Sequence, residues 1–318
     1  MKKSTIINNN VRESFADTIY DVGKKDKKLC VIVSDISHYR LQKFANENPG
    51  RYYNLGVCEN SILNVAAGIA HAGFIPVVHT FASFLIDKSY EQLKLSFGYN
   101  KLPVNLVVIG SGIEYSYHGV THHSYVDSVL VKSIENSCVY NPGSFFEFDK
   151  IFKQTYNNGK INLYRATTKP HNISYNDFPT LKYVAKNNAI VIKKGKDLTI
   201  IVTGHHLNVA VNSIEKFKKN NVDIEILYVP TLKPLDHKSI SLSLKKTKKF
   251  IIMEHQSQYG GLFSDICSLL LSNKDYSGII GKNISFGDRF IHEYGTFDQH
   301  NHRLNFSVQG LFNKYKEF

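Results

Sequence analysis

Hydrophobic positions along this chain follow two patterns, continuous apolar runs and apolar residues that recur every three to four positions. In the first half, the continuous runs predict buried strands, and the periodic stretches between them predict amphipathic helices. The predicted strands are 29–34, 74–81, 104–109, 138–144 and 160–165, and the predicted helices are 59–73, 84–97 and 145–156. Strands that alternate with helices indicate a parallel sheet covered on both faces.

The same alternation begins again in the second half of the chain. Its predicted strands are 198–204, 222–228 and 250–254, and its predicted helices are 206–219 and 260–273. Residues 166–188 contain Pro170 and Pro179 and lack a clean periodicity, which is typical of a linker. The sequence therefore predicts two parallel-type α/β domains, residues 1–170 and 189–318, joined by a linker at 171–188.

Composition narrows the classes of function. The 318 residues carry a formal net charge of +12, but the lysines are scattered beside turn signals, which indicates a solvated surface rather than a nucleic-acid site. We expect no membrane segment, because no apolar run approaches the roughly 20 residues that span a bilayer and Met1–Asn10 lacks a signal-peptide core. Four dispersed cysteines without a Cys-x-x-Cys pair fit a reducing compartment, so we expect a cytoplasmic protein.

We also expect no metal site built by this chain. The pairs His122-His123 and His205-His206 are adjacent in sequence, which points consecutive side chains in different directions. His300 and His302 supply only two ligands, and a His-Glu-x-x-His motif is missing from the sequence. A phosphate-binding glycine loop and a Gly-x-Ser-x-Gly motif are missing as well.

One acidic residue, Glu59, stands at the start of the small-residue helix predicted at 59–73. Taken alone, an acid in a first helical turn is usually a favourable partner of the helix dipole. The alternative is a buried functional carboxylate. Burial against Ala66 and Ala67 would raise the pKa of this carboxylate. We expect desolvation to outweigh the helix dipole.

Neighbouring motifs favour the functional interpretation. Gly56-Val-Cys-Glu59-Asn is followed by Thr80-Phe81-Ala-Ser-Phe84, Tyr90-Glu-Gln92 and Gly119-Val-Thr-His122-His-Ser124, and later by Thr231-Leu-Lys-Pro234, Glu254-His255 and Gly260-Gly261. In this order and spacing the chain resembles the transketolase family of thiamine diphosphate enzymes, over roughly residues 10–310. The resemblance implies a pyrimidine-binding domain followed by a transketolase C-terminal domain. Nothing matches the family's Gly-Asp-Gly motif for diphosphate and magnesium, so the chain is similar to the second subunit of a split transketolase.

The resemblance implies roles for individual residues. Glu59 is the acid that shares a proton with the pyrimidine ring of thiamine diphosphate, whose own aminopyrimidine is the base. Phe81 and Phe84 pack around that ring, and Asp35 corresponds to an acid near the cofactor. His122 lies in the substrate channel and moves protons, and Arg165 binds a substrate phosphate. Mg2+ is held by a separate N-terminal subunit, and the expected assembly is α2β2.

Two positions depart from the family pattern. His118 stands where longer transketolases have an acidic residue, and Gly110 stands where they have a histidine, and both positions normally contact sugar hydroxyls. The substrates are therefore expected to be sugar phosphates or modified sugars. Three alternatives stay open: a two-carbon ketol transferase, a 1-deoxyxylulose 5-phosphate synthase-like or 2-oxoacid dehydrogenase beta-type subunit, and a non-catalytic partner subunit.

Overall fold

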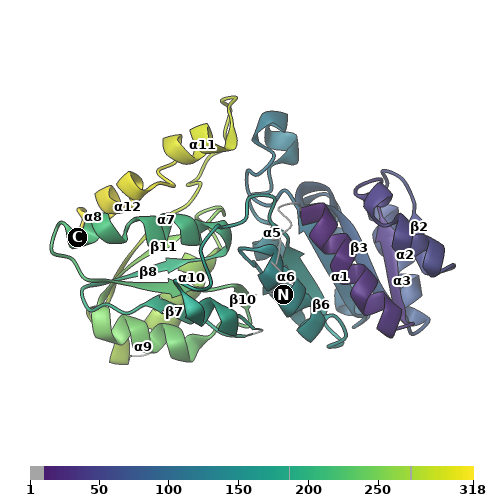
Figure 1. The fold of residues 1–318 in the computed structure, drawn as a ribbon, viewed down its shortest axis with the longest axis horizontal. Coiled ribbons are helices and arrows are strands. Elements are labelled where there is room, and N and C mark those ends of the chain that lie inside the picture. The colour runs from purple at the N-terminus through teal and green to yellow at the C-terminus, as the bar shows by residue number, and fades with distance from the viewer. Residues whose placement is uncertain (1–10, 186, 273) are drawn as a thin grey trace, which may run out of the picture.

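The computed structural model describes residues 11–185, 187–272 and 274–318 (Figure 1). Residues 1–10 of the predicted first domain, residue 186 of the predicted linker and residue 273 of the predicted last helix lie outside the described residues. The described chain forms two sheets, each covered by helices, and the prediction of two α/β units is confirmed.

The first sheet has seven strands in the order β10-β5-β6-β4-β3-β1-β2. All neighbouring pairs are parallel except β10 with β5. Strand β10 comes from the second half of the chain, so the two halves share this sheet. The bounds are β1 Leu29–Val33, β2 Tyr52–Asn54, β3 Ile75–Phe81, β4 Val104–Ile109, β5 Ser137–Tyr140, β6 Ile161–Arg165 and β10 Thr231–Lys233.

Helices cover both faces of this sheet. Alternate strand residues fall into two separate apolar clusters: Val31, Val77 and Val107 pack with α1 and α6, whereas Ile32, Val78 and Leu106 pack with α3, η2 and η3. This alternation is the two-residue period of a strand buried on both sides. The helical bounds are α1 Val11–Lys25, η1 His38–Arg40, α2 Gln42–Glu47, α3 Glu59–His71, η2 Ser83–Asp87, α4 Tyr90–Gln92, η3 Leu93–Tyr99, η4 Ser116–His118, η5 Val120–His122, α5 Asp127–Lys132 and α6 Phe145–Thr155.

The second sheet has five strands in the order β12-β11-β8-β9-β7, of which only β7 is antiparallel to its neighbour. Its strands are β7 Ile190–Lys193, β8 Leu198–Val202, β9 Ile224–Tyr228, β11 Lys249–Met253 and β12 Ile280–Ile284. The helical segments are η6 Pro179–Tyr183, η7 Gly204–His206, α7 Leu207–Asn212, α8 Ile214–Lys218, α9 His237–Thr247, α10 Leu262–Leu271, η8 Lys274–Tyr276, α11 Phe297–Arg303 and α12 Val308–Tyr315. Helices α9 and α10 cover one face, and α7, α8 and α12 cover the other.

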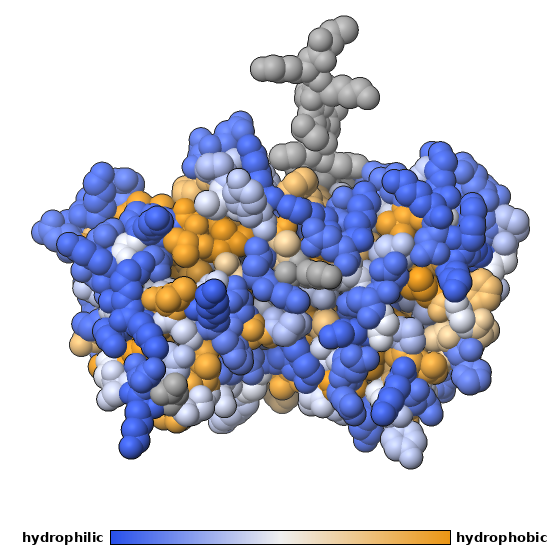
Figure 2. All heavy atoms as spheres, turned by 90° about the horizontal axis from the view of Figure 1, so that it is seen from below, coloured by the Kyte–Doolittle hydropathy of each residue, from blue (hydrophilic) through white to orange (hydrophobic). Residues whose placement is uncertain are grey.

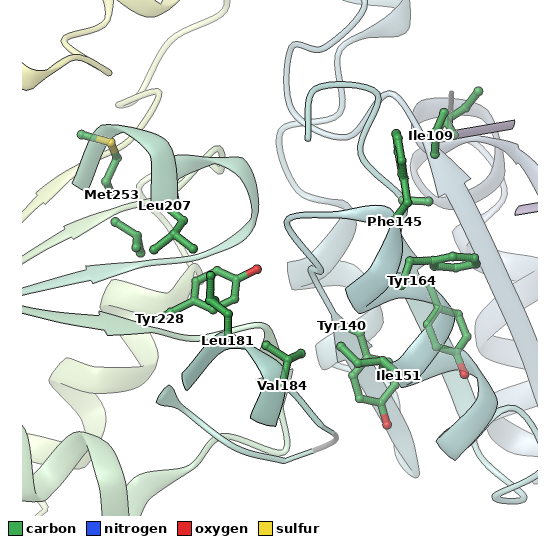
Figure 3. Packing of buried hydrophobic residues seen from close by; sticks show 14 of the residues in the cluster. Ile109, Tyr140, Phe145, Ile151, Tyr164, Leu181, Val184, Leu207, Tyr228 and Met253 are labelled. Carbon is green, nitrogen blue, oxygen red and sulfur yellow. The ribbon is translucent and has the colours of Figure 1, made fainter. Parts of the chain in front are cut away.

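One apolar cluster continues from the first sheet to the second. Figure 3 shows Tyr140 and Ile151 facing Val184 and Leu181 across the junction. Leu181 and Val184 lie in the predicted linker, yet both are fully buried. The linker was expected to cross the surface because its sequence is polar and contains proline, but those two apolar side chains anchor it in the core.

Two predicted helices differ from the observed elements. The predicted helix 84–97 consists of two π-helical segments, η2 and η3, separated by the short α4. The predicted helix 206–219 begins as the 3-10 turn η7 and is divided between α7 and α8 at Ser213. The Ser213 hydroxyl donates to the Ala210 carbonyl oxygen at 2.7 Å, a local bond that competes with regular helix.

Hydrophilic and hydrophobic areas are mixed on the face of the molecule that Figure 2 shows. Figure 2 shows hydrophilic side chains over much of one face, with hydrophobic areas between them. Among the described residues, no helix combines the length and the apolar character needed to cross a bilayer.

Candidate functional site

The carboxyl ends of β1, β3, β4 and β6 meet at one edge of the first sheet, because these strands are parallel. Ligand sites of open α/β sheets form at this edge. Of the residues predicted for the site, Asp35, Phe81 and Arg165 lie at or directly after these strand ends, and Glu59 begins α3, which follows the edge strand β2.

Glu59 is buried at the first position of α3, with 1% of its surface exposed. A turn at Gly56, whose φ is 74°, leads into the helix. The Glu59 Oε1 atom accepts a hydrogen bond from Ser34 Oγ at 3.0 Å, and Oε2 accepts one from Lys88 Nζ at 2.8 Å. Neither partner is predictable from the sequence, because they lie 25 and 29 residues from Glu59 and no local pattern connects them to it.

These contacts correct the expectation for the pKa of Glu59. Burial acts to raise it, as expected, but the hydrogen bond from Lys88, the first-turn backbone N–H and the Ser34 hydroxyl together hold the pKa of the carboxyl below its ordinary value. The prediction from sequence did not include Lys88 as a partner of Glu59. With a pKa below 4.5, the Glu59 carboxyl is expected to be ionised at pH 7, where it faces Lys88 Nζ.

Five aromatic rings form a second part of the site. Phe81 lies edge-on to Phe84, Tyr115 and His122, with ring centroids 5.8, 4.8 and 5.5 Å away, and the rings of His118 and His122 are 4.5 Å apart. Phe81, Phe84 and His122 are half-buried, and His118 is exposed. The structure thus brings together four residues predicted for the site and adds Tyr115. Flat, partly open apolar walls of this kind suit a flat heterocycle.

His122 is a half-buried imidazole in this aromatic cluster. Burial, and secondarily the neighbouring His118, lower the pKa of His122 below its ordinary value. A hydrogen bond of 3.0 Å joins its Nδ1 atom to Thr121 Oγ1. The imidazole is therefore neutral at pH 7, and its remaining nitrogen can act as donor or acceptor.

Gly110 has a structural reason to be glycine. Its φ is 76°, and a Cβ atom at this position would lie 2.8 Å from the Tyr115 ring. The Tyr115 ring therefore occupies the space beside position 110, where longer transketolases are expected to carry a histidine.

Two predicted residues lie apart from the aromatic rings. Asp35 is exposed, and its carboxylate accepts a hydrogen bond from Asn54 Nδ2 at 3.0 Å. Arg165 is 2% exposed; its Nε donates to Asp127 Oδ2 at 2.9 Å and its Nη2 to the His255 carbonyl oxygen at 3.1 Å. These contacts make Arg165 a buried link between the two halves of the chain. Its predicted contact with a substrate phosphate would require the guanidinium to leave Asp127.

The residues present fit the pyrimidine half of a thiamine diphosphate site. A buried carboxylate and half-buried aromatic walls lie at the same sheet edge, and Lys88, which bonds Glu59, follows Phe84 by four residues in the chain. Lys88, whose side chain is 49% exposed, occupies Oε2, one of the two carboxylate oxygens of Glu59.

Comparisons with known proteins agree with this geometry. Residues 8–170 match the family model "Transketolase, pyrimidine binding domain", and residues 187–283 match "Transketolase, C-terminal domain". A 6-deoxy-6-sulfo-D-fructose transketolase subunit of Clostridium sp. is 29% identical over 83% of this chain and 81% of its own length. One of the subunits of an apulose-4-phosphate transketolase, from Phocaeicola vulgatus, is 26% identical over 85% of this chain and 86% of its own length.

Two further matches define the extent of the likeness. A 1-deoxy-D-xylulose-5-phosphate synthase of Halothermothrix orenii is 28% identical over 87% of this chain, which covers only 43% of that enzyme. A solved structure described as a split gene transketolase, inactive beta4 tetramer, superimposes with a TM-score of 0.82 at 21% identity, over 96% of this chain and 97% of its own. The matched domains and the shared fold show that this chain belongs to the transketolase family, whose pyrimidine-binding and C-terminal domains it contains.

Proposed function

We propose that this chain is the second subunit of a split transketolase and supplies the pyrimidine half of a thiamine diphosphate site. The observation that carries the proposal is the buried Glu59 carboxylate at the sheet edge that also holds the aromatic cluster. The reaction is transfer of a two-carbon ketol unit between sugar phosphates or modified sugars. The two relatives named as transketolase subunits act on different sugars, so their names support the reaction class and leave the substrate open.

In this proposal Glu59 shares a proton with the cofactor's pyrimidine ring, after Lys88 has moved from Oε2 into solvent. Phe81 and Phe84 hold the ring by flat apolar contact. The chemistry that thiamine diphosphate supplies when bound is cleavage and formation of a carbon–carbon bond next to a carbonyl. His122 gives and takes protons at substrate oxygens, and the exposed His118 binds a sugar hydroxyl. Asp35 contributes at the rim of the cofactor site.

The proposal includes a partner subunit that carries the diphosphate and Mg2+ motif, in an α2β2 assembly. Exposed apolar side chains on and near α3, the helix that begins with Glu59, support it. Helix α3 lies next to η3, joined by the Ser96 hydroxyl donating to Asn64 Oδ1 at 2.8 Å. Large hydrophobic side chains on and near these elements stay open to solvent: Val57, Val65, Leu95 and Tyr99. Such a surface is typical of a protein interface. The expected location of the assembly is the cytoplasm.

The test combines this chain with the separately encoded chain that carries the Gly-Asp-Gly motif, thiamine diphosphate and Mg2+. Ketol transfer is followed from a panel of ketose phosphates. We expect turnover only when both chains are present, loss of turnover in Glu59→Gln, and full turnover in Glu215→Gln, an exposed glutamate on α8 that serves as the matched control.

Other outcomes would decide between the alternatives. Consumption of pyruvate without ketol transfer would favour a 1-deoxyxylulose 5-phosphate synthase-like or 2-oxoacid dehydrogenase beta-type activity, an interpretation that the Halothermothrix orenii relative supports. Assembly of both chains without turnover on either substrate class would favour a non-catalytic partner subunit.

A further inference from the structure

Three histidines meet at the carboxyl edge of the second sheet. His205 and His206 lie in η7, directly after β8, and His255 follows β11. Strands β8 and β11 are parallel neighbours with Val202 paired to Met253, so their ends deliver these residues to the same place. The ring centroids are 4.3 Å apart for His205 and His206, 4.7 Å for His205 and His255, and 4.4 Å for His206 and His255.

This arrangement corrects the expectation that adjacent histidines diverge. In an extended strand, consecutive side chains point to opposite faces. Here the chain turns as a 3-10 helix from Gly204, whose φ is 57°, and this turn places the two rings side by side. Adjacency in sequence therefore does not exclude a shared ligand site at His205 and His206.

Each ring presents a buried nitrogen without a hydrogen-bond partner. These atoms are Nε2 of His205, Nε2 of His206 and Nδ1 of His255. His206 is 2% exposed and His255 is 4% exposed, so water does not readily satisfy them. One potential ligand atom from each ring lies within 4.8 Å of the other two. Buried polar atoms are normally paired, so three unpaired nitrogens in one place indicate a missing partner.

The protonation states suit metal coordination. His255 Nε2 lies 2.9 Å from Asn301 Oδ1, an acceptor, so Nε2 carries the proton and Nδ1 keeps a free lone pair. Metal-binding histidines commonly donate their second N–H to a carbonyl oxygen in this way. Burial lowers the pKa of His205 to about 3, and it lowers the pKa values of His206 and His255 well below 6.5. All three rings are therefore neutral at pH 7, as ligands must be.

The surroundings of the rings restrict the class of ion. Phe286, Phe297 and Phe306 form apolar walls around His255, with ring centroids between 4.5 and 5.6 Å away. Arg165 and Lys169 add positive charge near His205. A set of three imidazoles in apolar surroundings suits Zn2+, Co2+, Ni2+ or Cu2+ rather than Mg2+ or Ca2+, which prefer oxygen ligands. The nearby cations favour a water-derived hydroxide or another anion as the fourth ligand.

We propose that His205, His206 and His255 form a binding site for one borderline transition-metal ion, with Zn2+ as the reference ion. Zinc–nitrogen bonds of about 2.0–2.1 Å in a tetrahedron put ligand atoms about 3.3 Å apart, so binding draws ligand atoms that lie within 4.8 Å together by up to about 1.5 Å. All three ligands follow strands of the second sheet, and the thiamine site lies on the first. Because Arg165 bonds the His255 carbonyl oxygen, the ion would also stiffen the junction between the two halves.

The test uses the full-length chain without a histidine tag, stripped of metal with a chelator. Co2+ is titrated into it, and the visible absorption bands of tetrahedral Co2+ are recorded, with Zn2+ then added as the competitor. We expect one Co2+ per chain, displacement by one Zn2+, and a rise in melting temperature on loading. The His205→Gln and His255→Gln variants should lose the tetrahedral bands and bind at least tenfold more weakly.

His237→Gln is the matched control, because His237 is an exposed histidine at the start of α9. It should keep the wild-type spectrum and stoichiometry. Circular dichroism checks that each variant is folded, and if His255→Gln does not fold, the more accessible His205→Gln decides. Absence of a 1:1 complex in the folded wild-type chain would overturn the proposal, and so would equal binding by the wild type and His205→Gln.

Discussion

The ion pair between Lys88 and Glu59 is the contact that most changes the candidate site, and Lys88→Met tests it directly. Methionine keeps most of the aliphatic stem and removes the ammonium group. A hydrogen bond to a charged group contributes about 1.5–3 kcal/mol. Because 49% of the lysine side chain is exposed, screening by solvent reduces this to about 1–2 kcal/mol. We expect the free energy of unfolding at pH 7 to fall by that amount.

The pH dependence has a definite sign. The folded-state pKa of Glu59 lies below its ordinary value of 4.5, so the ion pair stabilises the fold above pH 4.5 and this stability is lost as the pH falls through the folded pKa. The difference between wild type and Lys88→Met should therefore shrink below pH 4.5. In the variant, burial acts without the lysine to oppose it, so the pKa of Glu59 should rise.

Two measurements check this reasoning. Urea unfolding of wild type, Lys88→Met, Glu59→Gln and the double variant gives a coupling energy at pH 7 and at pH 4. Carbon-13 NMR of the glutamate carboxyls, assigned by comparison with Glu59→Gln, gives the titration of Glu59. Lys94→Met, which removes an exposed lysine from η3, is the control for a general loss of charge. A coupling energy below about 0.5 kcal/mol at pH 7, or an unchanged titration of Glu59, would refute the argument.

Three further predictions concern the same sheet edge. Arg165→Met leaves the Asp127 carboxylate buried without its cation, so urea unfolding should show a loss of about 3–5 kcal/mol; a loss under 1 kcal/mol would mean that the pair is dispensable. Gly110→Ala forces a Cβ against the Tyr115 ring at positive φ and should lower the free energy of unfolding by about 1–3 kcal/mol in a thermal unfolding assay. Gly68→Ala, on the open side of α3, is the control and should be neutral or stabilising by up to about 1 kcal/mol in that assay. Burial, and secondarily Asp127, raise the pKa of Asp87 to about 7 from 3.8. As the pH rises from 3.8 to about 7, the Asp87 carboxyl ionises in the unfolded chain before it ionises in the folded chain, so the free energy of unfolding falls over this pH range. Asp87→Asn should therefore raise the unfolding free energy at pH 8 by about 1–3 kcal/mol and change it little at pH 4; the same gain at both pH values would contradict the assignment.

Local patterns were sufficient for much of the fold. Strands β4, β6 and β8 lie within one or two residues of their predicted bounds, because a strand buried on both faces is a continuous apolar run in the sequence. The short strands β2 and β10 were not predicted, because three residues are too few to show a period. Helix α1 was missed as well, and it covers one face of the first sheet with Phe15 and Ile19.

The candidate site also has residues that the sequence could identify and contacts that it could not. Residues that belong to motifs of the family resemblance could be named from sequence, and Phe81, Phe84 and His122, from two such motifs, do lie together. Contacts outside those motifs could not, because residue types carry no record of which strand ends become neighbours. Lys88 at Glu59 and Asp127 at Arg165 are contacts of that kind, and each changes the chemistry that the motif alone suggested.

The sequence by itself determined the class of fold, most of the buried strands, the family resemblance and the acid at the start of α3, since each depends on spacing along the chain. Only the tertiary structure decided the charge state of Glu59, the interior position of Arg165 and the meeting of His205, His206 and His255. Those properties depend on desolvation and on atoms within a few ångströms, and the folding of parallel strands brings such atoms together from residues far apart in sequence.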